Sequence, residues 1–260
     1  MKRFFRKNLP SIICGAIALI IMWLVWIISV KTVKNEYVIP GVKQTFSALF
    51  DVFKEALFWR ALLRTLAKTV IAVAISFVLA GILSLPTKMS KNFGRVMRPI
   101  VAVIRTLPTM AVLVLILIYT DRTTAPVIVA MLVLFPMSYA QFNVALNGID
   151  EGVVRTAKVF NLTKKQKVFK VYLPLVAPNV LSHLGSNLSF GIKVIVSAEV
   201  MALTYTSIGG MIQSANALMD VPRLFALTLV AVILGILVEA IFQLLLTFAF
   251  KWTRAEGGND

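Results

Sequence analysis

Long apolar runs alternate with short polar segments along most of the chain. A run of about 20 mostly apolar residues is the length that a helix needs to cross the hydrocarbon core of a bilayer. The pattern therefore predicts a polytopic membrane protein with six transmembrane helices. We place these spans at Ile12–Val30, Leu62–Leu85, Pro99–Tyr119, Pro126–Leu146, Val180–Tyr205 and Leu224–Phe250.

The segment between the first two spans has a different pattern. From Pro40 to Phe58, apolar residues recur at helical spacing, but the polar residues between them are too many for a span. This pattern favours an amphipathic helix that lies at the outer membrane interface. We therefore divide the chain into an N-terminal unit (1–61), a transmembrane core (62–250) and a cytoplasmic tail (251–260).

Composition agrees with lipid as the solvent. Hydrophobic residues make up 59% of the 260 residues, whereas soluble domains have about 45–50%. One core cannot bury such a surplus, because the interior of a domain this size is too small. A single cysteine, Cys14, and a single histidine, His183, exclude an internal disulfide framework and a Cys/His metal cluster.

The net charge of +16 carries a different meaning in a membrane protein than in a soluble one. In a soluble domain it would suggest nucleic acid. Here Lys and Arg concentrate in the segments that six spans place on the same side as both termini, and such a bias marks the cytoplasmic side. We expect cytoplasmic N- and C-termini and membrane lipid, not nucleic acid, as the basic surface's neighbour.

A basic stretch from Arg155 to Pro174 interrupts the apolar pattern in the loop 147–179. Asn161 is suited to the left-handed turn that ends a helix, and Thr163 begins a capping box with Gln166. We expect two short helices around a tight turn, with Pro174 ending the second. Attraction to anionic lipid would explain the basic residues. It would not explain the apolar residues at the turn, which favour a docking element for a cytoplasmic partner.

This stretch resembles the cytoplasmic loop of ABC-importer permeases, whose motif reads E-A-A, three residues, G, nine residues, I, one residue, L-P. Arg155, Thr156 and Ala157 fall on E-A-A, and Asn161 falls on the glycine; Arg155 reverses the charge of the family's acid. The resemblance extends over about residues 60–250. There, "RTLPTMAVLVLILIY" and "SAEVMALTYTSIGGMIQSA" are similar to segments of the nitrate/sulfonate/taurine-type permeases.

The resemblance implies an all-α bundle of type I importer architecture in a bacterial inner membrane, working as a homodimer. It also implies ATP-binding cassette ATPase subunits at the loop and an extracytoplasmic substrate-binding protein near Thr204–Asp220. The chain has no P-loop to cradle ATP, so a partner subunit would bind the nucleotide, and this chain would need no cofactor. No hydrolase motif is present, so we expect no enzyme. The residues expected to couple to the ATPase are Arg155, Thr156, Ala157, Phe160, Asn161, Leu162, Thr163, Leu173 and Pro174.

Charged residues inside the expected spans suggest a substrate route. A charge at mid-bilayer costs about 2.5–3.5 kcal/mol on insertion scales, so it normally faces a partner or water. We assign Pro108, Lys193, Ser197 and Glu199 to a translocation pathway. Lys193 would favour an anionic substrate; alternatively, it snorkels or pairs with Glu239. The resemblance implies a small anion such as a sulfonate, taurine or nitrate. A vitamin precursor such as a thiamine pyrimidine, and a secondary transporter without an ATPase, remain the alternative functions.

Overall fold

The computed structural model describes residues 2–33, 35 and 38–249, and every regular element among them is a helix. This confirms the predicted all-α class. The elements are α1 (Lys2–Val33), α2 (Val42–Lys54), α3 (Ala56–Met89), α4 (Lys91–Thr106), α5 (Thr109–Tyr119), α6 (Ala125–Asn147), α7 (Glu151–Val159), α8 (Lys164–Lys167), a π-helical turn η1 (Val168–Tyr172), α9 (Leu173–Ser182), α10 (Leu184–Met201), α11 (Ile208–Ala217) and α12 (Val221–Ala249).

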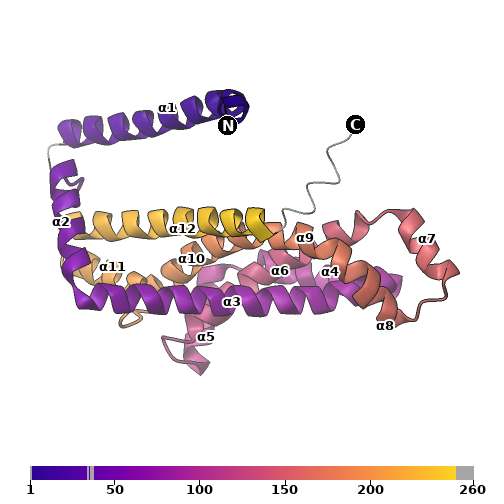
Figure 1. The fold of residues 1–260 in the computed structure, drawn as a ribbon. Helices are drawn as coiled ribbons and strands as arrows, with labels where there is room; N and C mark the ends of the chain where they lie inside the picture. Colours follow the sequence, from indigo (N-terminus) through magenta and orange to yellow (C-terminus); the bar gives the residue numbers. More distant parts are fainter. Residues whose placement is uncertain (1, 34, 36–37, 250–260) are drawn as a thin grey trace.

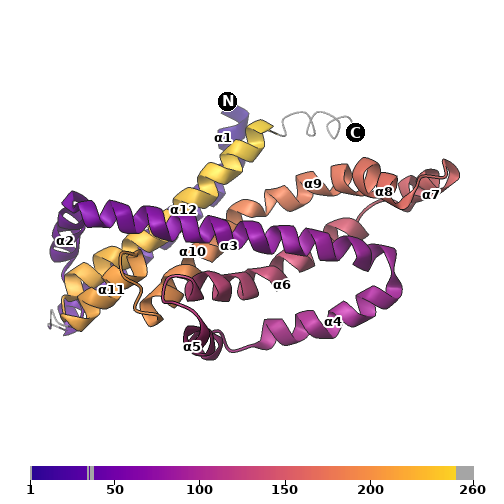
Figure 2. The same cartoon turned by 90° about the horizontal axis from the view of Figure 1, so that it is seen from below.

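The molecule is elongated in the view of Figure 1 and has two distinct ends, and α12 crosses α3 obliquely when seen from below (Figure 2). At one end, α2 lies across the ends of α3 and α12, close to α11. At the other end, α7 and α8 project beyond the bundle. Seen from below, α6 lies between α3 and α4 (Figure 2), and it packs against both.

Four described helices are long and apolar enough to cross a membrane: α3, α6, α10 and α12. The pair α4–α5 makes up to five if it counts as one span. The first expected span lies in α1, where the described apolar stretch Ile20–Val33 is shorter than a full span. Six spans therefore stay a prediction, and so does the unit boundary after residue 61, which falls inside the continuous α3. The expected tail, 251–260, lies outside the described residues.

The third expected span is not one straight helix. A bend of 92° separates α4 from α5. Leu107, between them, has an extended backbone with φ −61° and ψ 129°. The residue before a proline is pushed out of the helical region, and Pro108 has no N–H to continue the hydrogen-bond ladder. By contrast, α6 runs through Pro136, and α3 runs past Pro86, where we had placed the end of the second span.

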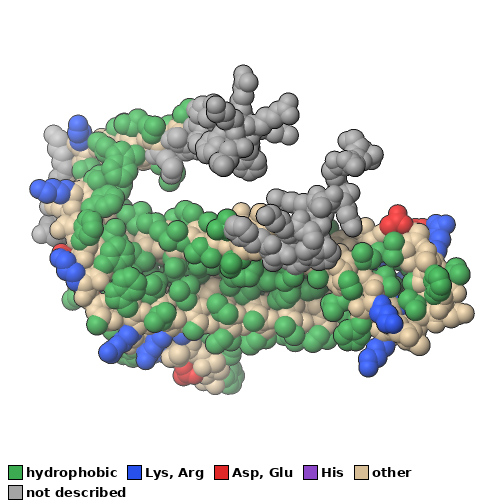
Figure 3. Space-filling model, in the orientation of Figure 1, with side chains coloured by type: hydrophobic (Ala, Val, Ile, Leu, Met, Phe, Trp, Pro, Cys, Tyr) green, Lys and Arg blue, Asp and Glu red, His purple; other side chains and the backbone are tan. Residues whose placement is uncertain are grey.

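Apolar side chains form the core and also cover the outside. One buried cluster joins α2, α3, α10, α11 and α12 around Phe58, Ile192 and Leu227, and another joins α3, α4, α6 and α9 around Met97 and Val180. Figure 3 shows apolar side chains covering the flank between the two ends, while Lys and Arg gather toward the ends. Such a belt suits a lipid environment.

Candidate functional site

The turn between α7 and α8 has the local geometry that the sequence predicts. Asn161 adopts the left-handed conformation with φ 50°. The Leu162 amide donates to the Ala157 carbonyl at 3.2 Å, the wrap-around bond of a Schellman C-cap. Two hydrogen bonds complete the capping box: the Thr163 amide donates to Gln166 Oε1 at 2.9 Å, and the Gln166 amide donates to Thr163 Oγ1 at 3.3 Å. The predicted helix–turn–helix and capping box are confirmed as local structure.

The turn presents apolar side chains to the outside. Val159, the last residue of α7, is 78% exposed, and Phe160, the next residue, is 74% exposed. Beside them is a hollow of about 650 Å³. It is lined by Gly152, Val153, Thr156, Ala157, Phe160, Leu162 and Val171. The exposed ring of Phe160 and this hollow lie together at the end of the molecule. We call them the loop tip.

Arg155, the reversed charge of the loop motif, has a partner within its own helix. Its Nη2 lies 2.9 Å from Glu151 Oε2, one turn earlier. Both side chains are exposed, so the pair contributes little stability. It does place an acid beside the basic residue, so the helix still presents a carboxylate close to the position where the family motif has one.

Pro174 does not end the second helix, and the expectation that Leu173-Pro174 breaks it is wrong. The turn Val168–Tyr172 widens to π geometry, and the Leu173 amide donates to the Val168 carbonyl. The widened turn accommodates a residue without an N–H, so α9 continues through Pro174. π-turns of this kind occur frequently at functional sites.

Lys193 and Ser197 line a cavity of about 260 Å³ between α5, α6 and α10. Thr109, which follows Pro108 at the start of α5, lines the same cavity. The remaining lining residues are Met110, Leu113, Val129, Val133, Phe190, Val194 and Ala198. Lys193 is therefore the one charged side chain of an otherwise mostly apolar cavity. Within the described part of the chain it forms no ion pair, and Glu239 accepts a hydrogen bond from Ser186 instead.

Glu199 lies apart from that cavity, in a buried polar cluster. Its side chain is fully buried, and Oε1 lies 2.8 Å from Lys68 Nζ on α3. Oε2 accepts from Thr65 Oγ1 at 2.9 Å and from the Gly209 amide at 3.3 Å. The cluster ties α3, α10 and the start of α11 together, which favours a structural role for Glu199. Sequence reasoning missed Lys68, although a lysine within an apolar run was a signal that it needed a partner.

Asp121 organises the loop between α5 and α6. Its carboxylate accepts from the hydroxyl of Thr124 and from the amides of Thr123 and Thr124. The Thr124 hydroxyl bond and then these amide bonds lower the pKa of Asp121 to about 2. Asp121 therefore stays ionised at neutral pH and holds the first turn of α6, where the helix dipole favours a negative charge.

Comparison with known proteins places these features in context. Residues 72–249 match the family described as "Binding-protein-dependent transport system inner membrane component". SsuC of Bacillus subtilis (strain 168), named as an aliphatic sulfonates transport permease protein, is 28% identical over 79% of this chain and 76% of its own. The taurine transport system permease protein TauC of Escherichia coli (strain K12) is 24% identical over 86% of this chain and 83% of its own.

A solved structure shares the fold. The structure titled as a bacterial alginate ABC transporter in complex with an alginate pentasaccharide-bound periplasmic protein has a chain that aligns with a TM-score of 0.63. The alignment covers 93% of this chain and 95% of that one at 14% identity. At this identity the likeness establishes the fold alone.

Proposed function

We propose a coupling site and a substrate class for this chain, which belongs to the family of inner membrane components of binding-protein-dependent transport systems. It is a permease of an ABC importer, not an enzyme, and it is a multi-pass protein of the inner membrane. In our proposal, its loop tip receives an ATP-binding cassette ATPase. The cavity around Lys193 then takes a small anion that a binding protein delivers at the opposite end.

The arrangement of the ends supports an orientation with α7 and α8 in the cytoplasm. The start of α1, the end of α12 and the turn between α3 and α4 all point toward the α7 end, and α2 and α11 lie at the other (Figure 1). With cytoplasmic termini, the basic α3–α4 turn and the basic loop fall on the positive side. The binding protein then meets the end formed by α2 and α11, where Thr204–Asp220 lies.

The exposed apolar side chain of Phe160 is the observation that carries the coupling proposal. The phenyl ring of Phe160 is 74% exposed, and Phe160 directly follows α7, which projects beyond the bundle (Figure 1). An isolated aromatic side chain beside a hollow is the arrangement of an interface anchor. The left-handed turn at Asn161 and the capping box fix its direction, so the helix pair can transmit movement as a rigid body.

The coupling proposal predicts that Phe160→Asp combined with Leu162→Asp weakens ATPase binding by about 30-fold, because a buried anchor contributes about 2 kcal/mol or more to an interface. The measurement is the affinity of the purified permease for its ATP-binding cassette subunit. Phe169→Asp is the matched control, since Phe169 is also exposed and apolar but does not line the hollow of the loop tip. Undiminished binding by the double variant would show that the ATPase docks elsewhere.

The substrate proposal depends on the unpaired Lys193 ammonium in its cavity. An ammonium without an acid beside it attracts an anion, and the mostly apolar lining strengthens that attraction. The relatives named for aliphatic sulfonates and for taurine point to the same chemistry. We therefore propose a small organic sulfonate or a similar oxyanion as the substrate. Two copies of the chain would enclose the route as a homodimer.

Lys193→Met is expected to lower the specificity constant for uptake of an anionic substrate by about tenfold, the effect of losing 1.4 kcal/mol. Lys193→Arg should retain most of the specificity constant. Uptake is measured with the complete transporter in vesicles at saturating and subsaturating substrate. Lys31→Met, which removes an exposed charge in the last turn of α1, is the control. Unchanged anion uptake by Lys193→Met would contradict the proposal and favour a cationic or neutral substrate such as a thiamine pyrimidine.

A further inference from the structure

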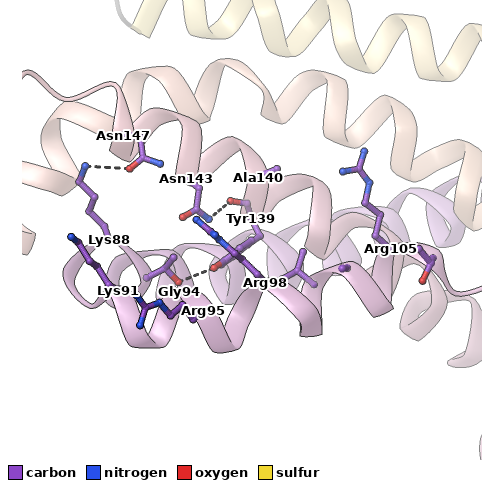
Figure 4. A pocket seen from close by; sticks show the side chains of 14 residues that line it. Lys88, Lys91, Gly94, Arg95, Arg98, Arg105, Tyr139, Ala140, Asn143 and Asn147 are labelled. Atoms are coloured by element: carbon purple, nitrogen blue, oxygen red, sulfur yellow. Dashed lines mark hydrogen bonds between the residues drawn. The ribbon is translucent and has the colours of Figure 1, made fainter.

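A second and larger cavity lies along α4, on the side of the molecule that carries the basic loop. It has a volume of about 900 Å³ and is bounded by α4 and the adjoining ends of α3 and α6. Five basic side chains line it: Lys88, Lys91, Arg95, Arg98 and Arg105 (Figure 4). The described residues of its lining include no acid. The remaining polar groups, such as Tyr139 and Asn143, are neutral.

The register of α4 aligns the basic residues on one face. Lys91, Arg98 and Arg105 are seven residues apart, which returns nearly the same direction after two helical turns. Each step advances about 10.5 Å along the axis. The other face of α4 carries the exposed apolar side chains of Val96 and Val103. The helix thus separates a lipid-facing side from a positively charged side that faces the cavity.

The bias toward basic residues at the cytoplasmic surface accounts for only part of this row of basic side chains. A bias toward basic residues at the cytoplasmic surface would supply Lys88 and Lys91. Arg98 and Arg105 lie about two and four turns further into the span, where a basic residue without a partner is costly. In the described part of the chain, neither guanidinium forms an ion pair or a hydrogen bond. Their donors are therefore available to a ligand that enters the cavity.

The two cavities are lined by residues on either side of the bend in the third span. Thr106, the last residue of α4, lines the basic cavity, and Thr109, the first residue of α5, lines the cavity of Lys193. Only Leu107 and Pro108 separate them. Of the basic residues in the larger cavity, Arg105 is the nearest to this bend along the chain, and Arg98 is the next.

We propose that the basic cavity is an anion-binding exit tract, in which Arg105, Arg98 and Lys91 successively bind the oxyanion of the substrate. This inference rests on the proposed substrate class. Guanidinium groups bind sulfonate, phosphate and carboxylate oxygens through paired hydrogen bonds. Several sites of moderate strength in a row let an anion enter and leave, which one tight site would prevent. A phospholipid headgroup has the same chemistry, so the test must separate the two sources.

The test measures the electrostatic potential of the cavity with charged thiol reagents. Ala102→Cys, in a Cys14→Ser background, places a thiol on the cavity lining of the full chain in phosphatidylcholine nanodiscs. The probes are the anionic sulfonatoethyl and the cationic trimethylammonioethyl methanethiosulfonates. We expect the anionic-to-cationic rate ratio to exceed that at an exposed reference thiol, Leu218→Cys, by about tenfold. It should fall steeply in 1 M salt.

Variants identify which charges create the preference for the anionic reagent. Arg98→Gln with Arg105→Gln should reduce the ratio at least about threefold, and free ethanesulfonate should slow the anionic reagent. Arg60→Gln with Arg64→Gln, which removes two exposed charges of α3 outside the cavity, should leave the ratio unchanged. A rate ratio at Ala102→Cys equal to that at Leu218→Cys would overturn the proposal. The dependence of the ratio on salt tests the charge of the cavity without any arginine variant.

Two further arms separate the alternatives. If phosphatidylglycerol in the nanodisc blocks the anionic reagent while ethanesulfonate gives no protection, the cavity holds a lipid headgroup and the exit tract is wrong. In the complete transporter, Arg98→Gln with Arg105→Gln should reduce maximal anion uptake about tenfold. Wild-type uptake by this variant, with Lys193→Met still impaired, would refute the tract and leave the proposed function intact. A transporter that carries no anion would refute the proposed function instead.

Discussion

Replacing Glu199 with alanine is expected to destabilise the permease by about 3–5 kcal/mol, the cost of leaving the other member of a buried ion pair without its partner. Glu199 is fully buried, and the Lys68 ammonium lies 2.8 Å from its Oε1. The substitution also removes the acceptor for the Thr65 hydroxyl and the Gly209 amide. Lys68 would then keep a charge in a region from which solvent and counter-charges are excluded.

A double-mutant cycle tests this expectation. Lys68→Met and Glu199→Ala should each lower the thermal midpoint of the detergent-solubilised protein by several degrees. The double variant should recover part of the loss, because it leaves no uncompensated charge. Lys54→Ala, which breaks an exposed ion pair with Asp51, should change stability by less than about 0.5 kcal/mol. Strict additivity of the two buried substitutions would show that they do not form an energetic pair.

The buried pair also shows where sequence reasoning reached its limit. The Asn161 turn and the Thr163–Gln166 capping box were predictable, because the groups that form them lie within a few residues of each other. The Lys68 partner of Glu199 was not, because 131 residues separate the two in the chain. The sequence placed Glu199 on the substrate route because it had no visible partner; the fold supplies one.

Prolines mark a second limit of the same kind. Pro108 and Pro136 both lie within apolar runs, but only Pro108 lies at a sharp bend. Each proline frees a carbonyl, and neighbouring helices decide whether the helix can tolerate this. The sequence contains the proline but not the neighbours. The bend matters for function because it brings the end of α4 next to the cavity of Lys193, and the basic cavity becomes visible only in the folded chain.

The Arg residues of α4 illustrate how a correct general rule can conceal a specific role. The excess of Lys and Arg in cytoplasmic loops explains basic residues near the cytoplasmic surface. The sequence alone gave no reason to separate Arg98 from Lys91. Heptad spacing was present in the sequence as a signal. It gained meaning only when the structure placed the charged face against a cavity and left the apolar face exposed on the other side.

Gly209→Ala should be as damaging as the loss of the buried pair, with a cost of about 3 kcal/mol from overpacking. A Cβ at this position would lie 2.6 Å from the Val196 carbonyl oxygen and 2.8 Å from the Val200 amide nitrogen, and it would also collide with Glu199. Backbone atoms of α10 cannot move aside as a flexible side chain could. The first turn of α11 must therefore separate from α10.

The thermal midpoint and the yield of monodisperse protein measure this effect. Gly94→Ala is the matched control, because its Cβ would meet the Thr87 methyl at 3.4 Å and would favour the helix intrinsically. We expect the control to be neutral or slightly stabilising. If Gly209→Ala were equally mild, the close packing of α11 on α10 would be unnecessary. Because that packing brings the Gly209 amide to Glu199, its loss should also displace the segment that we assign to the binding protein, and transport should fail even in the fraction that still folds.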